Sequence, residues 1–243
     1  MVNNFTVIES IYGKFIVNRH CANQAEALIK TGATHIEHEL KNILAIADLL
    51  PANPVVVDVG ANIGLVCVPI ANAIRQNGGI VHAFEVQRMM YYALCGTAAL
   101  NDLDNLWVHH RGLGKASTSL KVPLPDYGRP KDFGMVSLLD QEKITDHETV
   151  EIVALDELKL PGLDLLKIDV EGMEIEVLEG AKESIRTFRP WCWIEYWMVE
   201  KELLRKQFET LDYNIYVMDK LNILCTPREK LDASGVTINA PLF

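Results

Sequence analysis

The stretch Pro54–Gly64, PVVVDVGANIG, constrains the fold more than any other part of the chain. A β-branched run leads through Asp58 into two glycines, Gly60 and Gly64, after which the apolar residues recur at helical spacing. This order predicts a buried strand, a tight turn and a helix that packs back on the sheet. Glycine at position 60 lets a ligand approach the main chain, and Asn62 is placed to cap the helix. We therefore expect this turn to hold a ligand.

Two classes of cofactor use such a turn, and the sequence separates them in part. A dinucleotide site requires G-x-G-x-x-G, whereas the spacing here is G-x-x-x-G. The carboxylate of Asp58 would repel a pyrophosphate and attract an ammonium group, which S-adenosylmethionine carries. Glu85 ends the next expected strand, where a carboxylate would bind the ribose diol of either cofactor. Read singly, these acids are strand ends and the glycines a plain turn, but their order within one βαβ unit favours a cofactor site.

Length and charge limit the remaining choices. A chain of 243 residues suits one large α/β domain, which we place at 53–243 with an insertion at 115–150, preceded by an N-terminal hairpin and helical cap at 1–52. No apolar run reaches ~18 to 20 residues, and we expect no signal peptide, so the sequence predicts a cytoplasmic protein without a membrane span. The net charge of −10 argues against nucleic acid or an anionic membrane as partner. The five scattered cysteines are expected to be reduced thiols.

The N-terminal cap is expected to contain a hairpin at 2–20 and helices at about 22–31 and 34–50. We interpret these residues as a cover over the cofactor. His35 and His38 are spaced three apart on the second helix, but no further ligand stands at metal-binding spacing, so a solvated helix face is the better interpretation. No metal site is predicted from them.

The middle of the chain continues the α/β alternation and then departs from it. A helix at 87–101 precedes a strand at 105–110, and Gly112 and Leu113 follow that strand, where they could line the cofactor's adenine or form a simple β-turn. Between 115 and 160 the pattern indicates a β-rich insertion with a proline-rich centre. Long loops at the ligand-binding end of a sheet commonly select the substrate, so we assign 115–150 to the acceptor side.

A second informative stretch runs through LKIDVEGME, residues 166–174. Strand alternation places Lys167, Asp169 and Glu171 on one side, although a central parallel strand is normally apolar on both faces. An ion-pair cluster would explain them structurally, but burying charges costs several kcal/mol per ion, which favours a function. Glu174 is expected to face solvent on the following helix. A fifth core strand ends near Glu195, and a closing hairpin covers about 214–225.

With both stretches considered, the chain resembles the FkbM-type methyltransferases, a family of class I S-adenosylmethionine-dependent enzymes. The resemblance covers about 53–197 and is carried by five segments: VDVGANIG at 57–64, AFE at 83–85, ALDEL at 154–158, LLKIDVEGME at 165–174 with VLEGA at 177–181, and 190–195. It implies a Rossmann-like α/β fold whose seven-stranded, mostly parallel sheet closes with an antiparallel hairpin. It also implies that Asp58, Gly60, Asn62, Gly64 and Glu85 hold the cofactor and that Asp169 and Glu171 line the reaction site.

We therefore predict an O-methyltransferase that acts on a hydroxyl group of a small molecule or sugar; self-association is compatible with the sequence. The alternatives are a nicotinamide-dependent oxidoreductase and a non-catalytic cofactor-binding module. For the chemistry, our hypothesis is that Lys167 pairs with Asp169, which orients the hydroxyl, while Glu171 or a divalent ion between the two acids assists deprotonation. The competing view is that holding the hydroxyl and the methyl group close together and in line is enough for the transfer, without a base.

Overall fold

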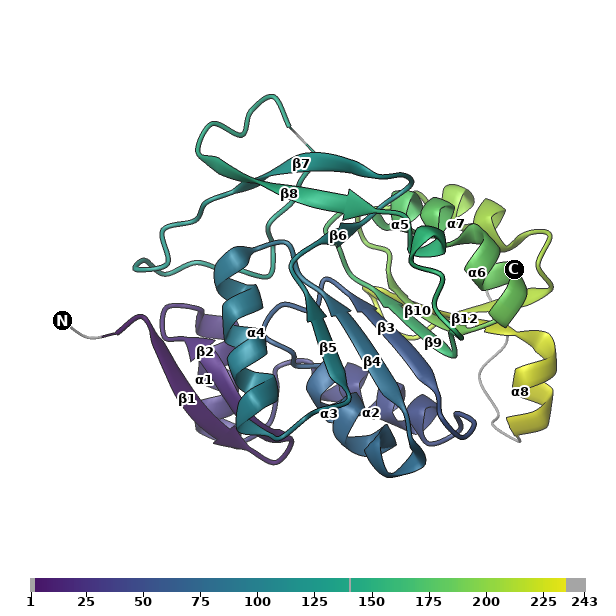
Figure 1. Ribbon diagram of the computed structural model, residues 1–243, viewed down its shortest axis with the longest axis horizontal. Coiled ribbons are helices and arrows are strands. Elements are labelled where there is room, and N and C mark those ends of the chain that lie inside the picture. The colour runs from purple at the N-terminus through teal and green to yellow at the C-terminus, as the bar shows by residue number, and fades with distance from the viewer. Residues whose placement is uncertain (1–2, 140, 235–243) are drawn as a thin grey trace.

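Seven strands form the central sheet of the computed structural model, which describes residues 3–139 and 141–234 (Figure 1). Their order is β11-β12-β10-β9-β3-β4-β5. The strands β10, β9, β3, β4 and β5 are mutually parallel, and β12 runs antiparallel to β10 and β11. Their bounds are Val55–Val59 (β3), Ile80–Phe84 (β4), Leu106–His109 (β5), Leu165–Ile168 (β9), Trp191–Glu195 (β10), Tyr213–Val217 (β11) and Asn222–Pro227 (β12). The predicted mostly parallel sheet with a closing hairpin is confirmed.

The order of the strands determines where a ligand can bind. From β3 the chain continues to β4 on one side, whereas β9 is added later on the other side. In open α/β sheets such a change of direction leaves a crevice beyond the carboxyl ends of the strands. Both informative stretches of the sequence end at this edge, because β3 and β9 are neighbours.

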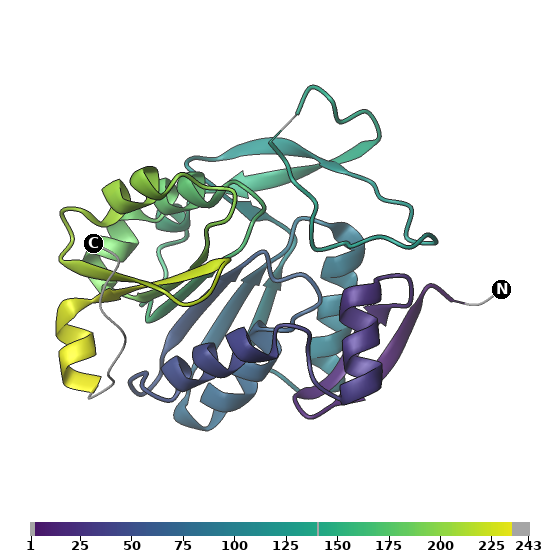
Figure 2. The ribbon, with the colours of Figure 1, turned by 180° about the vertical axis from the view of Figure 1, so that it is seen from behind.

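Helices cover both faces of the sheet, and each face has its own apolar core (Figures 1 and 2). Strand alternation divides the residues of β3, so that Val56 belongs to one core and Val57 to the other. The first core is shared with α1 (Ala22–Thr31), α2 (Glu37–Ala47), α3 (Cys67–Ile74) and α4 (Arg88–Leu100). The second is shared with α5 (Glu174–Gly180), α6 (Lys182–Phe188) and α7 (Lys201–Phe208). Short 3₁₀ turns lie at Arg75–Asn77 and Leu155–Leu158.

The N-terminal cap contains the predicted hairpin, β1 (Phe5–Ser10) and β2 (Gly13–Asn18), which packs against α4. The backbone amide of Ile16 donates a 3.0 Å hydrogen bond to the hydroxyl of Thr97, which joins the two elements. As predicted, the first helix ends at Gly32, which has a left-handed φ of 67°. The second helix is shorter than expected at both ends.

The insertion forms a small three-stranded sheet, ordered β6-β8-β7, above the main sheet in Figure 1. Its strands are Gly112–Leu113 (β6), Thr118–Pro123 (β7) and His147–Val153 (β8), so it begins at Gly112, before the expected boundary at 115. The connection between β7 and β8 returns to the main body, where Gln87 Nε2 donates a 2.7 Å hydrogen bond to the carbonyl of Phe133. The hydroxyl of Ser137 donates to the carbonyl of Glu171 at 2.9 Å.

Three local predictions are wrong. Asn62 does not cap α3, because the helix begins at Cys67 and Asn62 adopts a left-handed φ of 50°. The helix expected after Gly172 is divided into α5 and α6, and Glu174 is buried rather than solvated. Beyond β12 the chain forms α8 at Arg228–Ser234, and residues 235–243 lie outside the described part of the chain. Within the described part of the chain, no helix is both long and apolar enough to span a membrane.

Candidate active site

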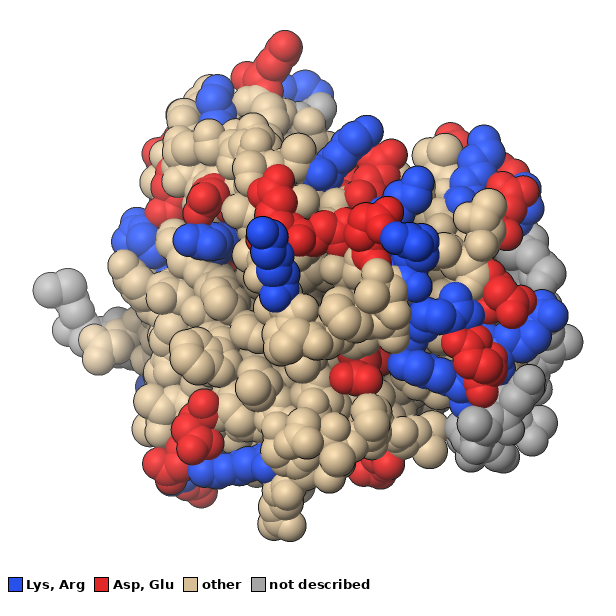
Figure 3. Space-filling view, turned by 45° about the vertical axis from the view of Figure 1, so that its right-hand side comes forward, with Lys and Arg blue, Asp and Glu red and all other residues tan. Residues whose placement is uncertain are grey.

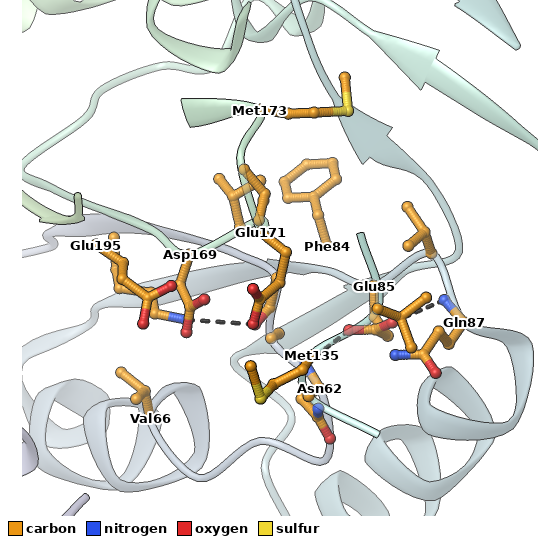
Figure 4. A pocket seen from close by; sticks show the side chains of 18 of the residues that line it. Asn62, Val66, Phe84, Glu85, Gln87, Met135, Asp169, Glu171, Met173 and Glu195 are labelled. Carbon is orange, nitrogen blue, oxygen red and sulfur yellow. Dashed lines mark hydrogen bonds and ion pairs between the residues drawn. The ribbon is translucent and has the colours of Figure 1, made fainter. Parts of the chain in front are cut away.

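A cavity of about 470 Å³ opens at the carboxyl edge of the sheet (Figure 4). This volume lies within the range of ~300 to 1,000 Å³ that is usual for small-molecule sites. Its wall combines the ends of β3, β4, β9 and β10 with the strand β6, the cap and the loop 132–138. The polar side chains on the wall are Gln24, His35, Glu39, Asn62, Glu85, Gln87, Asp132, Lys167, Asp169, Glu171 and Glu195.

The turn after β3 is held close to the neighbouring strands. The amides of Gly60 and Ala61 both donate 3.0 Å hydrogen bonds to the carbonyl of Phe84, at the end of β4. Gly60 has a φ of 80°, and a Cβ atom added there would lie 1.8 Å from the carbonyl oxygen of Asp169. A side chain is therefore excluded at position 60 by both conformation and contact.

Glu85 lies at the end of β4, with only 4% of its surface exposed. Its carboxylate accepts hydrogen bonds from the backbone amides of Asn62, at 2.8 Å, and Gln87, at 2.7 Å. Burial raises the pKa of Glu85 to about 7, against the opposing effect of these two amides. Each carboxylate oxygen can accept more than one hydrogen bond, so both retain capacity for a donor from the cavity.

Lys167 is the buried cation of the site. Its Nζ atom lies 3.2 Å from Asp58 Oδ1 and 3.3 Å from Asp169 Oδ2, and it donates a 3.3 Å hydrogen bond to the carbonyl of Gly60. Burial disfavours the ammonium form, but the surrounding carboxylates of Asp58, Asp169 and Glu39 outweigh this effect and raise the pKa of Lys167. The lysine therefore stays charged and connects the glycine turn to the acids beyond β9.

Three carboxylates gather next to this lysine: Asp169, Glu171 and Glu195 each offer an oxygen atom within 4.8 Å of the other two. The backbone between the first two is held by Glu174, whose Oε1 accepts the amides of Val170 and Gly172 at 3.2 Å each. Glu171 has a left-handed φ of 55°, which is uncommon for a residue with a side chain and often occurs at functional sites. Burial, and then the neighbouring Asp169 and Glu174, raise the pKa of Glu171 to about 7.

Among residues 3–139 and 141–234, these three acids form the only group with spacing that suits a metal ion. However, the ammonium of Lys167 already provides a positive charge 3.3 Å from Asp169. A divalent cation bound to the same carboxylate would be repelled by it. We therefore assign no metal ligand in this cavity.

The structure brings together eight of the ten residues that the sequence singled out. Those on the cavity wall are Gly60, Asn62, Glu85, Gly112, Leu113, Lys167, Asp169 and Glu171. Asp58 lies behind the wall, fully buried, with its carboxylate directed to Lys167 rather than to the cavity. Gly64 allows close packing, since a Cβ atom there would lie 2.5 Å from Leu94 Cδ1.

Several residues on the wall were not singled out from the sequence. Glu39 from α2 reaches the cavity, accepts a 3.1 Å hydrogen bond from Trp193 Nε1, and has its pKa raised to about 7 by burial. No local motif marks Glu39, because its role depends on how the cap docks. Glu195 carried a signal, an acid at the end of an apolar strand, that could have placed it with the other acids.

A Rossmann-like sheet with a glycine turn, an acid after β4 and a polar cavity at the switch point is the architecture of class I methyltransferases. The Methyltransferase FkbM domain matches residues 58–220, more than half of the chain. The chain therefore belongs to the FkbM methyltransferase family, and the prediction of an S-adenosylmethionine-dependent methyltransferase is confirmed.

Two proteins show how close this similarity is. The chain is 30% identical over 196 residues to methyltransferase sdnD from Sordaria araneosa, a match that covers 67% of this chain and 73% of that protein. The fold is similar to the crystal structure of methyltransferase FkbM from Methylobacillus flagellatus KT, with a TM-score of 0.53 and 17% identity. That match covers 86% of this chain but only 55% of the other, so the chain spans about half the length of that protein.

Proposed function

We propose that this methyltransferase transfers a methyl group to a hydroxyl oxygen of a small molecule or sugar. The observation that carries the proposal is the pair Asp169 and Glu171 on the cavity wall, with the pKa of Glu171 raised to about 7. A general base works best when its pKa is near the operating pH, and a hydroxyl acceptor must lose a proton during the transfer. The match to the Methyltransferase FkbM domain, and not this base, separates the methyltransferase from the nicotinamide-dependent oxidoreductase that the glycine turn alone would allow.

The cavity also fits the expected cofactor. Glu85 retains free acceptor capacity on both oxygens, which suits the two hydroxyls of a ribose. Gly60 lies on the cavity wall, and the missing side chain there lets the Asp169 backbone pack against the turn, while Gly112 and Leu113 form an apolar part of the wall. When bound, S-adenosylmethionine supplies a methyl group activated by a positively charged sulfonium. The acids beyond β9 are a favourable environment for that charge.

In the proposed mechanism, Asp169 would orient the acceptor hydroxyl and Glu171 would take up its proton. Bound S-adenosylmethionine would supply the methyl group and leave as S-adenosylhomocysteine. Lys167 keeps Asp169 ionised through the 3.3 Å ion pair. The loop 132–138 covers one side of the cavity with Met135, Val136 and Leu138, which limits access of water. Alignment of the two reactants within this closed site contributes the rest of the acceleration.

Electrostatics argue against a nucleic acid as the acceptor. The chain has a net charge of −10, and on the face shown in Figure 3 the described Lys and Arg side chains lie beside Asp and Glu rather than forming a basic patch. Phosphate backbones are bound mainly by clustered Lys and Arg. A neutral sugar or metabolite hydroxyl is the acceptor class that this surface and cavity favour.

Glu85→Ala is expected to weaken S-adenosylhomocysteine binding by ~1.5 to 3 kcal/mol, because it removes hydrogen bonds to a charged acceptor. The measurement is isothermal titration, with thermal unfolding as a check that the variant folds. Glu176→Ala is the matched control, since Glu176 lies on α5 and is not on the cavity wall. Equal affinity in a folded Glu85→Ala variant would show that Glu85 only organises the backbone of the turn.

The proposed base is tested with Glu171→Gln after a panel of sugars and hydroxylated metabolites has been screened for S-adenosylhomocysteine release. Loss of the base is expected to lower kcat by ~10²-fold or more while cofactor affinity stays nearly constant. Asp169→Asn is expected to lower kcat as well, because the oriented carboxylate is lost. Mass spectrometry of the product should show a methyl ether.

Two results would count against this function. A product methylated on nitrogen or carbon would replace the hydroxyl acceptor with another class. Turnover at the wild-type rate in both acid variants would show that alignment of the two reactants alone accelerates the transfer and that the acids only shape the cavity.

A further inference from the structure

Glu195 has no role in the mechanism above, although its carboxylate is part of the acid group. It ends β10, which lies parallel and next to β9, and it therefore meets the residues that follow β9 (Figure 4). One oxygen, Oε2, accepts a 3.1 Å hydrogen bond from Trp197 Nε1. Its carboxyl group also lies beside those of Asp169 and Glu171, with one oxygen of each within 4.8 Å of the others.

Two carboxyl groups this close can share a hydrogen bond only if one of them holds a proton, because ionised carboxylates are only acceptors. The charges around the pair make that proton favourable. The cavity wall carries Asp169, Glu171 and Glu195 together, with Glu39, Glu85, Asp132 and His35 elsewhere on it. Among the described residues of this wall, Lys167 is the only Lys or Arg. Lys167 is already shared between Asp58 and Asp169. Like charges at this spacing do not all ionise.

The position of each acid indicates which one holds the proton. Asp169 lies beside the ammonium of Lys167, which stabilises its ionised form. Glu195 has no cation partner among the ion pairs of the described residues, and its carboxyl group accepts a hydrogen bond from Trp197. Burial, and then Asp169 and Glu171, raise the pKa of Glu195 to about 9.

We propose that Glu195 is protonated in the working enzyme and acts as a positioning residue, donating a hydrogen bond that fixes the ionised carboxylate of Asp169 towards the acceptor. The neutral acid thereby orients Asp169 without adding a second negative charge at the reaction centre. A divalent cation held by the three acids is the opposite arrangement, since all three would then be ionised. The two arrangements respond differently to pH and to chelators.

The protonation state can be read without an acceptor, by carbon NMR of protein labelled at the glutamate side-chain carboxyl. The signal that disappears in Glu195→Gln is expected to titrate in the wild-type protein with a midpoint near 9. Glu39→Gln is the matched control on the same cavity wall, and its missing signal should titrate near 7. A Glu195 signal that titrates near the ordinary value of 4.5 would overturn the proposal.

A second test uses S-adenosylmethionine and S-adenosylhomocysteine, which differ by the methyl group and positive charge on sulfur. As pH rises through about 9, Glu195 loses its proton and gains a negative charge, so wild-type preference for the sulfonium ligand should increase by ~5- to 10-fold. Glu195→Gln cannot ionise and should show none of this additional increase. Equal pH profiles in the two proteins, measured by titration in freshly mixed samples, would contradict the proposal.

The metal arrangement is tested in parallel by adding magnesium or EDTA to the wild-type protein and to Glu195→Gln. No difference in cofactor affinity is expected for either protein. Tighter binding with magnesium in the wild-type protein alone would overturn the proposal, because it would show three ionised acids around a cation. The proposal uses the role assigned to Asp169, but these tests need no acceptor, so they succeed or fail separately from the hydroxyl transfer.

Discussion

Gly60→Ala is expected to abolish cofactor binding and to lower the free energy of unfolding by more than ~3 kcal/mol. The left-handed conformation alone costs alanine ~1 to 2 kcal/mol. In addition, the new Cβ atom would lie 1.8 Å from the carbonyl oxygen of Asp169, a backbone atom that cannot move aside as a flexible side chain could. Relief of this contact must separate the turn after β3 from the loop after β9, which form the two sides of the cavity.

Gly32→Ala is the matched control for this prediction. Gly32 also has a positive φ, 67°, but a Cβ atom there would have no neighbour within 4 Å. It should therefore show the conformational cost without the steric one. Chemical denaturation and titration with S-adenosylhomocysteine would compare the two variants. If Gly60→Ala binds the ligand and is no less stable than Gly32→Ala, the close approach to Asp169 does not limit the site.

The parts of the site that the sequence predicts are those whose signals lie close together along the chain. The strand, the glycine turn and Glu85 belong to one βαβ unit, so their order alone places them at one edge of the sheet. Lys167, Asp169 and Glu171 were likewise predicted on one side by strand alternation. They do meet in the cavity, although β9 ends at Ile168 and a left-handed turn, not a strand, directs Glu171.

The remainder of the site depends on contacts between segments far apart in the sequence. Asp58 was expected to attract the cofactor's ammonium, but its register partner across β3 and β9 is Lys167. That pairing follows from the order of strands in the sheet, which one sequence does not specify. Periodicity alone predicts Glu174 on the solvated face of a helix. It is buried because the amides of Val170 and Gly172, in the loop before α5, donate to its carboxylate.

Lys167→Met is expected to lower the free energy of unfolding by ~3 to 5 kcal/mol, because it leaves a buried carboxylate without its counter-charge. Asp58 is fully buried, and its Oδ1 atom lies 3.2 Å from Nζ of Lys167, with which it forms an ion pair. Methionine fills similar space but supplies no charge, so Asp58 would have to take up a proton or draw in water. The loss of the ammonium beside Asp169 should also remove methyl transfer.

Lys41→Met provides the control, since Lys41 Nζ lies at the same distance, 3.2 Å, from Glu37 but is 69% exposed. An exposed pair of this kind contributes at most ~1 kcal/mol, so the two variants differ in burial rather than in separation. The double variant Asp58→Asn with Lys167→Met removes both charges and should recover much of the lost stability. Denaturant unfolding of the wild-type protein and these three variants measures the differences in stability. Equal losses of stability in Lys167→Met and Lys41→Met would show that the buried ion pair does not stabilise the contact between β3 and β9.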